Sequence, residues 1–253
     1  MKLQSQRIGV PDLSCQDRAD MFALFAGHYD CADRDRFEAD LARKHWVIQL
    51  RDPAQGRLCG FSTQVLLKIR KGNSAVNALF SGDTIVDPAC WSETALMREW
   101  GRLVVELIEA TRPERLYWFL ISKGYKTYRF LPVFFREFYP RYDRTTPASA
   151  QEILDSLGRS MFGRAYDARR GVVTAMPDKD RLRMGIAEIT AHRLEDPHVR
   201  YFLERNPGHT RGDELCCLAR LDVANFTPAA VRLLDPENRP QQQNRPPELS
   251  GVP

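Results

Sequence analysis

Polar residues interrupt an otherwise apolar stretch of this sequence at Ser81-Gly82-Asp83. The stretch from Val76 to Val86 is rich in apolar and β-branched residues, which is typical of a β-strand. A carboxylate at such a position can accept a proton from a reacting group. The alternative interpretation is a β-bulge at Gly82 that leaves the side chains of Ser81 and Asp83 exposed.

Tyrosines and lysines alternate after the next apolar run, at Lys123, Tyr125, Lys126 and Tyr128. A tyrosine whose pKa is near 10 can donate a proton. A lysine beside a glycine at the start of a helix can hold a phosphate. The neighbouring sequence is so aromatic that packing in the core explains either tyrosine equally well, and the two lysines can be a solvated pair.

A third polar region extends from Asn206 to Asp213 and is dense in turn-forming residues. Such a loop can border a substrate pocket, and His209 within it can act as a base or lie on the surface. An aromatic row follows the tyrosines and is interpreted as core, with the lining of an acyl-chain tunnel as the alternative; its members are Phe130, Phe134, Phe135 and Phe138.

The elements that must position these residues follow from apolar periodicity and turn signals. Helices are expected over residues 14–28, 33–44, 92–110, 126–138, 145–161 and 192–204, with a kink or late start at Pro132 in the fourth. Strands are expected over residues 7–10, 45–50, 58–69, 76–86, 116–121, 171–175 and 214–221. Three antiparallel strands therefore lead into a strand–helix–strand crossover, which should be right-handed with parallel strands.

Composition limits the class of protein. The chain has 253 residues, of which 43% are hydrophobic and 28% charged, as in ordinary soluble domains. It has no apolar run long enough for a membrane helix and no signal peptide at its start, so a cytoplasmic location is expected. The six cysteines lack CxxC or Cys/His ligand spacing, so no metal site is expected.

The basic character is modest, with a net charge of +4. No basic stripe or recognisable motif accompanies it, so nucleic acid is not an expected partner. The residues from Asp235 onward are rich in proline, glutamine and asparagine, which predicts a disordered tail.

The order of two helices, antiparallel strands, and then strand, helix, strand and helix resembles the GNAT N-acyltransferase fold. The residues that carry the resemblance are Thr84-Ile85-Val86, the helix from Ser92, the strand Leu116–Ile121, and the aromatic helix with Tyr125 and Tyr128. It implies a mixed α/β (α+β) fold whose central sheet is mainly antiparallel and flanked by helices. Residues 1–145 would form the core, 146–234 a C-terminal helical extension that completes the sheet, and 235–253 the tail.

The resemblance also implies roles for the polar residues. Asp83 would be the base that deprotonates the attacking group, with Ser81 orienting the substrate, and Tyr128 the acid for the leaving thiolate. The acyl donor would contact Val86, Lys123, Tyr125 and Lys126, and the acceptor Asn206 and His209.

In the family, a glycine-rich loop binds the pyrophosphate of coenzyme A. The matching loop here, residues 86–94, contains Pro88 and two carboxylates but no glycine. Family members that take acyl groups from acyl carrier protein tolerate such a loop, and so do members without catalysis.

The predicted function is therefore acyl transfer from a thioester, either acyl-CoA or a phosphopantetheine-linked donor such as acyl carrier protein, to a small-molecule amine or hydroxyl. The alternative is a catalytically inactive GNAT-fold binding or scaffold protein. A splayed sheet with an open channel would favour the enzyme, and side chains that fill the channel would favour the scaffold.

Overall fold

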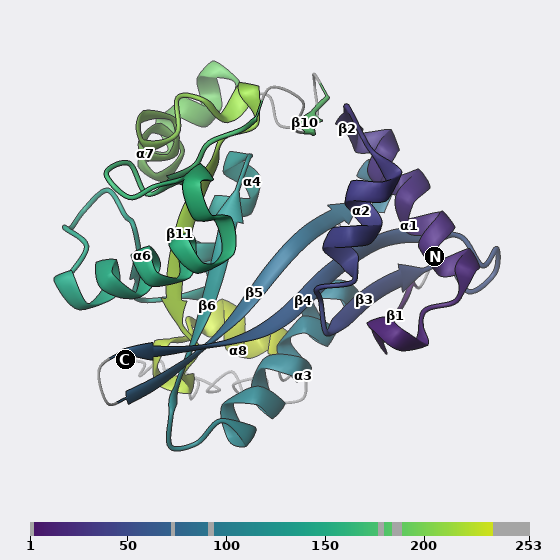
Figure 1. Ribbon diagram of the computed structural model, residues 1–253, viewed down its shortest axis with the longest axis horizontal. Coiled ribbons are helices and arrows are strands. Elements are labelled where there is room, and N and C mark those ends of the chain that lie inside the picture. Colours follow the sequence, from purple (N-terminus) through teal and green to yellow (C-terminus); the bar gives the residue numbers. More distant parts are fainter. Residues whose placement is uncertain (1–2, 72–73, 91–93, 177–179, 184–188, 235–253) are drawn as a thin grey trace, which may run out of the picture.

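The computed structural model describes residues 3–71, 74–90, 94–176, 180–183 and 189–234. A nine-stranded sheet forms its centre (Figure 1), with the strand order β1-β3-β4-β5-β6-β11-β9-β8 and with β7 paired to β11. Its strands are β1 (Gln4–Gly9), β3 (Trp46–Arg51), β4 (Leu58–Lys71), β5 (Ser74–Val86), β6 (Arg115–Ser122), β7 (Phe138–Tyr139), β8 (Tyr166–Asp167), β9 (Val172–Val173) and β11 (Glu214–Arg220). A separate ladder joins β2 (Tyr29–Asp30) to β10 (Arg181–Leu182).

Only β5 and β6 are parallel among the described strand pairs of the large sheet. The predicted fold class, a mixed and mainly antiparallel sheet flanked by helices, is therefore confirmed. The predicted run of antiparallel strands followed by a parallel crossover is also present.

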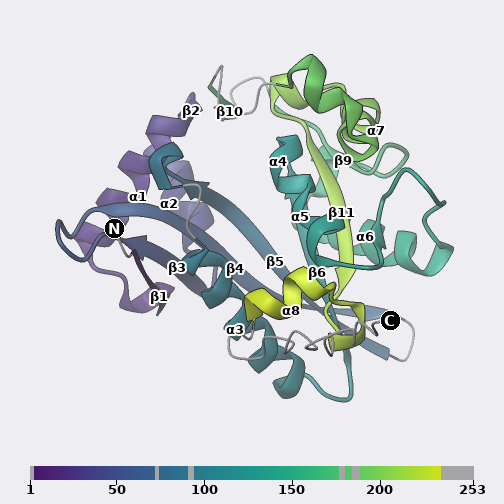
Figure 2. The ribbon, with the colours of Figure 1, turned by 180° about the vertical axis from the view of Figure 1, so that it is seen from behind.

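Helices cover both faces of the sheet (Figures 1 and 2). On β3, Val47 packs with α1 and α2 whereas its neighbour Ile48 packs with α3, so these helices lie on opposite faces. By the same alternation on β5, α6 lies opposite α3 and on the same face as α1 and α2. The helices are α1 (Cys15–His28), α2 (Arg34–Leu41), α3 (Ala95–Ala110), α4 (Tyr125–Tyr128), α5 (Phe130–Phe134), α6 (Ala148–Phe162), α7 (Pro197–Arg205) and α8 (Pro228–Leu234).

The local signals in the sequence explain where several elements begin. Ser14 caps α1: its hydroxyl accepts the Asp17 N–H at 3.0 Å, and the Asp17 carboxylate accepts the Ser14 N–H at 3.1 Å. The periodic apolar positions of α3 are buried in the core, as expected of an amphipathic helix; they include Leu96, Trp100, Leu103, Val104 and Leu107.

Some predicted elements were wrong in extent. The single helix expected over residues 126–138 is instead α4, α5 and the short strand β7, with the break at Arg129. Pro132 explains the break, because it has no N–H for the carbonyl four residues earlier. The helix expected from Ser92 begins at Ala95; Ser92 and the tail from Asp235 lie outside the described residues.

The division into a core and a C-terminal extension stays a prediction, although residues after 145 supply β8, β9 and β11 to the large sheet. None of the helices within the described ranges combines the length and the apolarity needed to cross a membrane.

Candidate active site between splayed strands

The strands β5 and β6 separate in the middle of the sheet. Their parallel pairing runs from Val76 and Arg115 to Ser81 and Leu120, while β5 continues to Val86 on a diverging course (Figure 1). The opening lies between the half of the molecule that carries α1 and α2 and the half that carries α4 and α7. The β2–β10 ladder connects the two halves across it, with Leu182 opposite Tyr29.

A cavity of about 1080 Å³ occupies this opening. It is lined by residues of both strands, by α1 and α2, and by residues of α3 to α6 and α8. Its volume lies just above the roughly 300–1000 Å³ that is usual for small-molecule sites. Asp83, Val86, Lys123 and Lys126 are among the lining residues, so the structure brings four of the predicted site residues together.

A β-bulge turns Asp83 toward this cavity. Gln64 pairs with Ser81 and Ser62 with Thr84, so two residues of β5 lie opposite one residue of β4. Phe80 and Ile85 consequently face the same side of the sheet, although they are an odd number of residues apart. The bulge at Gly82 that was the alternative interpretation is present, but Asp83 is only partly exposed and lines a cavity.

Neighbouring side chains approach Gly82 closely at the bulge. A Cβ atom at this position would lie 2.6 Å from the Thr63 hydroxyl oxygen and 2.9 Å from Lys44 Cε. A larger residue would therefore displace the side chains that surround Asp83.

Burial raises the pKa of Asp83 to about 7, and the nearby Asp40 carboxylate adds to the rise, while Lys123 and Lys44 oppose it. Lys44 is itself buried, hydrogen-bonded to Asp40 and 5.5 Å from the Phe80 ring centroid. A carboxyl group with a pKa near neutrality can both accept and return a proton at physiological pH.

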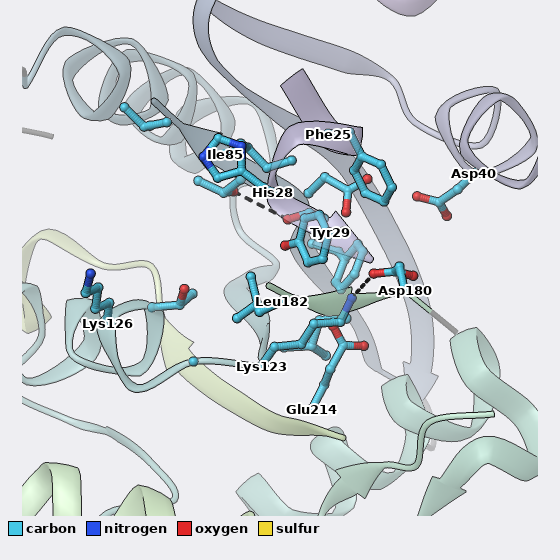
Figure 3. Close-up of a pocket in the computed structure, with 18 of the residues that line it drawn as sticks. Phe25, His28, Tyr29, Asp40, Ile85, Lys123, Lys126, Asp180, Leu182 and Glu214 are labelled. Carbon is cyan, nitrogen blue, oxygen red and sulfur yellow. Dashed lines mark hydrogen bonds and ion pairs between the residues drawn. The ribbon is translucent and has the colours of Figure 1, made fainter. Parts of the chain in front are cut away.

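Lys123 belongs to a buried charged cluster in the cavity wall, together with Asp180 and Glu214 (Figure 3). Its ammonium group is paired with Asp180, lies 3.6 Å from a Glu214 carboxylate oxygen and is 4.7 Å from the Tyr29 ring centroid. Burial alone would lower the pKa of Lys123, but Glu214, Tyr29 and Asp180 outweigh that effect and raise it. Lys123 therefore stays charged. Its contacts connect the end of β6 to Glu214 of β11, to Tyr29 of β2 and to Asp180.

The side chain of Ser81 faces the α3 side of the sheet, away from Asp83. Its hydroxyl donates to Gln64 Oε1 at 2.7 Å and accepts the Trp118 Nε1–H at 2.9 Å. Gln64 in turn donates to Ser62, whose hydroxyl contacts that of Thr84, each at 2.7 Å. This buried chain of hydrogen bonds fixes the two strands beneath the cavity, and Ser81 is not among the residues that line it.

The other predicted site residues lie away from the cavity. Tyr125 is buried in the core, and Tyr128 is fully buried, with its hydroxyl donating to the Pro140 carbonyl at 2.9 Å. Burial raises the pKa of Tyr128, so the phenol stays protonated. The Asn206 amide donates to the Asp213 carbonyl at 2.8 Å, and its side chain is fully buried.

His209 lies against the Phe202 ring, with centroids 5.7 Å apart, and burial lowers the pKa of its imidazole. It is not among the cavity-lining residues. The loop that contains Asn206 and His209 thus supports the start of β11 and contributes no side chain to the cavity wall within the described residues.

The cavity extends to the end of β5 and the start of α3. Val86 and Thr94, the residue before α3, both line it. The Asp87 carboxylate is directed to Arg57, whose guanidinium donates to it at 2.7 Å and lowers its pKa. One of the two carboxylates in this loop is therefore neutralised by an ion pair, while the other, Glu93, lies outside the described residues.

Sequence analysis missed several residues of the site. Tyr29, Asp40, Asp180 and Glu214 all line the cavity (Figure 3) and contribute to the electrostatics of Asp83 or Lys123. The one signal in the sequence is Glu214, a carboxylate at the start of the strand expected over residues 214–221. Asp180 lies in a segment without periodicity, and Tyr29 directly follows the helix expected over residues 14–28.

No protein family matches the sequence, and no curated protein is similar to it. Solved structures that resemble the chain include a probable N-acyltransferase from Enterococcus faecalis, with 15% identity, a TM-score of 0.40 and coverage of 65% of this chain. This chain spans 45% of the length of that protein.

A putative acetyltransferase of the GNAT family from Desulfovibrio desulfuricans has 12% identity and a TM-score of 0.40, covering 56% of this chain and 92% of its own. An acetyltransferase from Trypanosoma brucei has 16% identity and a TM-score of 0.36, covering 58% and 100%. At such identities and TM-scores, these structures supply no evidence about the substrates or catalytic residues of this chain.

Proposed function

We propose that this protein is an acyltransferase that moves an acyl group from a thioester to an amine or hydroxyl. The observation that carries the proposal is the cavity between the splayed strands, into which a bulge turns a carboxyl group with a pKa of about 7. Side chains that filled the opening would have favoured a scaffold without catalysis. The open cavity favours the enzyme.

The splayed strands suit the pantetheine arm that acyl-CoA and acyl carrier protein share. Among the described strands, none pairs with residues 82–85 on the side that faces β6. An extended chain with amide groups can add to such an edge through main-chain hydrogen bonds. The arm would then lie between β5 and β6, with its thioester beside Asp83.

Asp83 can serve both proton transfers of the reaction. The acceptor nitrogen or oxygen attacks the thioester carbonyl carbon, and the Asp83 carboxylate takes the proton that the acceptor loses. The C–S bond then breaks, and the Asp83 carboxyl group returns this proton to the departing thiolate. A group whose pKa is near the operating pH is suited to both steps, whereas the buried hydroxyl of Tyr128 reaches neither.

Lys126, an exposed residue of the cavity lining, adds positive charge to it. Burial and the neighbouring Arg193 both lower the pKa of its ammonium group. An anionic group of the donor, such as a phosphate, would be attracted by these two cations and would reduce their repulsion. Lys123 is less suited to this role, because Asp180 and Glu214 already neutralise it.

The proposal is tested by thermal shift and native mass spectrometry with acetyl-CoA, longer acyl-CoA and acyl carrier protein. A donor that binds the folded state should raise the melting temperature. Thiol release is then followed with a panel of amines and alcohols for wild type, Asp83→Asn and the control Asp87→Asn.

We expect Asp83→Asn to lower turnover by about 10²- to 10⁴-fold, which is the usual contribution of a positioned acid or base, while Asp87→Asn keeps most of it. Donor binding with equal turnover in wild type and Asp83→Asn would remove Asp83 from the mechanism. If no donor binds, acyl transfer is overturned and the scaffold alternative is favoured.

A further inference from the structure

The wall of the cavity beneath α6 is apolar. Met161 and Phe162, at the end of α6, are its lining residues from that helix, and Phe80 and Ile121 line it from the sheet. The Phe162 ring centroid lies 6.1 Å from that of Phe80. Phe80 is almost fully buried, whereas Met161 and Phe162 are partly exposed, so hydrocarbon surface faces the cavity here.

Charged residues line the cavity beside this apolar wall, on the side of α2. They lie in α2 and in the turns on either side of it, and they include Asp33, Arg36, Asp40, Arg43 and Lys44. The Lys44 ammonium group lies 5.5 Å from the centroid of the Phe80 ring, so the charged and apolar walls adjoin. Asp83 on β5 lies close enough to Asp40 and Lys44 for both to affect its pKa. Phe80 lies three residues before Asp83 on the same face of the sheet, a separation of roughly 10 Å along the strand. This distance is longer than an acetyl group.

The apolar wall and the charged wall together predict where each of the two reactants lies in the cavity. A thioester carbonyl beside Asp83 would have the apolar wall on one side and the charged residues of α2 on the other. An acyl chain gains free energy on leaving water, and a polar acceptor loses less among charged groups than among apolar ones. The acyl tail therefore fits the side of Phe80 and Phe162, and the acceptor fits the side of α2.

We propose, on the basis of the acyl transfer proposed above, that the donor carries a medium or long hydrocarbon acyl chain that lies along the wall of Phe80, Met161 and Phe162. The cavity volume of about 1080 Å³ leaves room for such a chain besides the pantetheine arm. Each buried methylene group strengthens binding by about fourfold, the fold-change that corresponds to about 0.8 kcal/mol.

The test compares the affinities of acetyl, octanoyl and dodecanoyl thioesters, each on coenzyme A and on acyl carrier protein, by calorimetry. Met161→Trp fills the apolar wall, and Val133→Trp is the matched control, because Val133 is 41% exposed and does not line the cavity. Melting curves report whether each variant folds. If Met161→Trp does not fold, Phe162→Leu is used instead. It enlarges the space beside the apolar wall and should raise the affinity for the longer acyl chain relative to the shorter ones.

We expect wild type and Val133→Trp to bind the dodecanoyl donor at least tenfold more tightly than the acetyl donor. Met161→Trp should lose at least tenfold in dodecanoyl affinity with little change for acetyl. Equal affinities for acetyl and dodecanoyl donors, or an equal loss of both in Met161→Trp, would overturn the chain proposal and leave acyl transfer standing. Failure of every donor to bind would overturn acyl transfer itself.

Discussion

The buried carboxyl group of Asp83 should make the stability of this protein depend on pH near neutrality. Its pKa of about 7 in the folded state compares with an ordinary value of 3.8. The folded state therefore keeps a proton that the unfolded state has already lost. The contribution of Asp83 to the free energy of unfolding is fully present below pH 3.8 and is lost as the pH rises from there through 7.

The size of the effect follows from the pKa difference. Three pH units correspond to about 4 kcal/mol in total, at about 1.36 kcal/mol for each unit. In an experiment from pH 5.5 to 8.5, the free energy of unfolding falls only between pH 5.5 and 7, by about 2 kcal/mol. For a protein of this size, that free energy corresponds to a change in melting temperature of about 4–8 °C.

The assay is thermal unfolding of wild type and Asp83→Asn from pH 5.5 to 8.5. Asparagine keeps the shape of the side chain and does not titrate, so the variant should gain about 4–8 °C on wild type as the pH rises. Asp87→Asn is the control: Arg57 lowers the pKa of Asp87, which therefore stays ionised throughout this range. A difference between wild type and Asp83→Asn that does not change with pH would refute the raised pKa.

Three further substitutions test the supports of the site. Lys123→Met should lower the free energy of unfolding by about 3–5 kcal/mol, measured in urea, because it leaves two buried carboxylates without their cation; a loss below 1 kcal/mol would contradict the charged cluster. Gly82→Ala should cost about 1–3 kcal/mol by overpacking the bulge and should slow turnover; wild-type stability and activity would show that the bulge has room. Tyr128→Phe should cost about 1 kcal/mol through its lost hydrogen bond and leave turnover unchanged; a large loss of turnover at unchanged stability would place the hydroxyl in the chemistry.

The sequence predicted the central elements because their signals are local. The apolar run of β6, the capping serine of α1 and the amphipathic pattern of α3 each depend on neighbouring residues alone. Asp83 was noticed for the same reason, since a carboxylate inside an apolar strand is unusual. The direction of its side chain was not predictable, because it depends on two residues of β5 lying opposite one residue of β4.

The partners of Lys123 were beyond sequence reasoning for a different reason. They come from β2, from the start of β11 and from Asp180, which are far apart in the chain, and β2 and β10 have only two residues each. Ladders this short leave no periodic pattern. The aromatic stretch around Tyr128 was ambiguous as well, because dense packing and catalysis use the same residue types.

The ladder between β2 and β10 has a topological consequence. Together with the ion pair of Lys123 and Asp180, it closes a ring of protein around the space between β5 and β6. A molecule that crossed the sheet between β5 and β6 would therefore be surrounded by protein on all sides. For the acyl transfer proposed above, the arm of a donor on a bulky carrier would enter this ring from one face of the sheet, and the acceptor would reach the thioester from the other face.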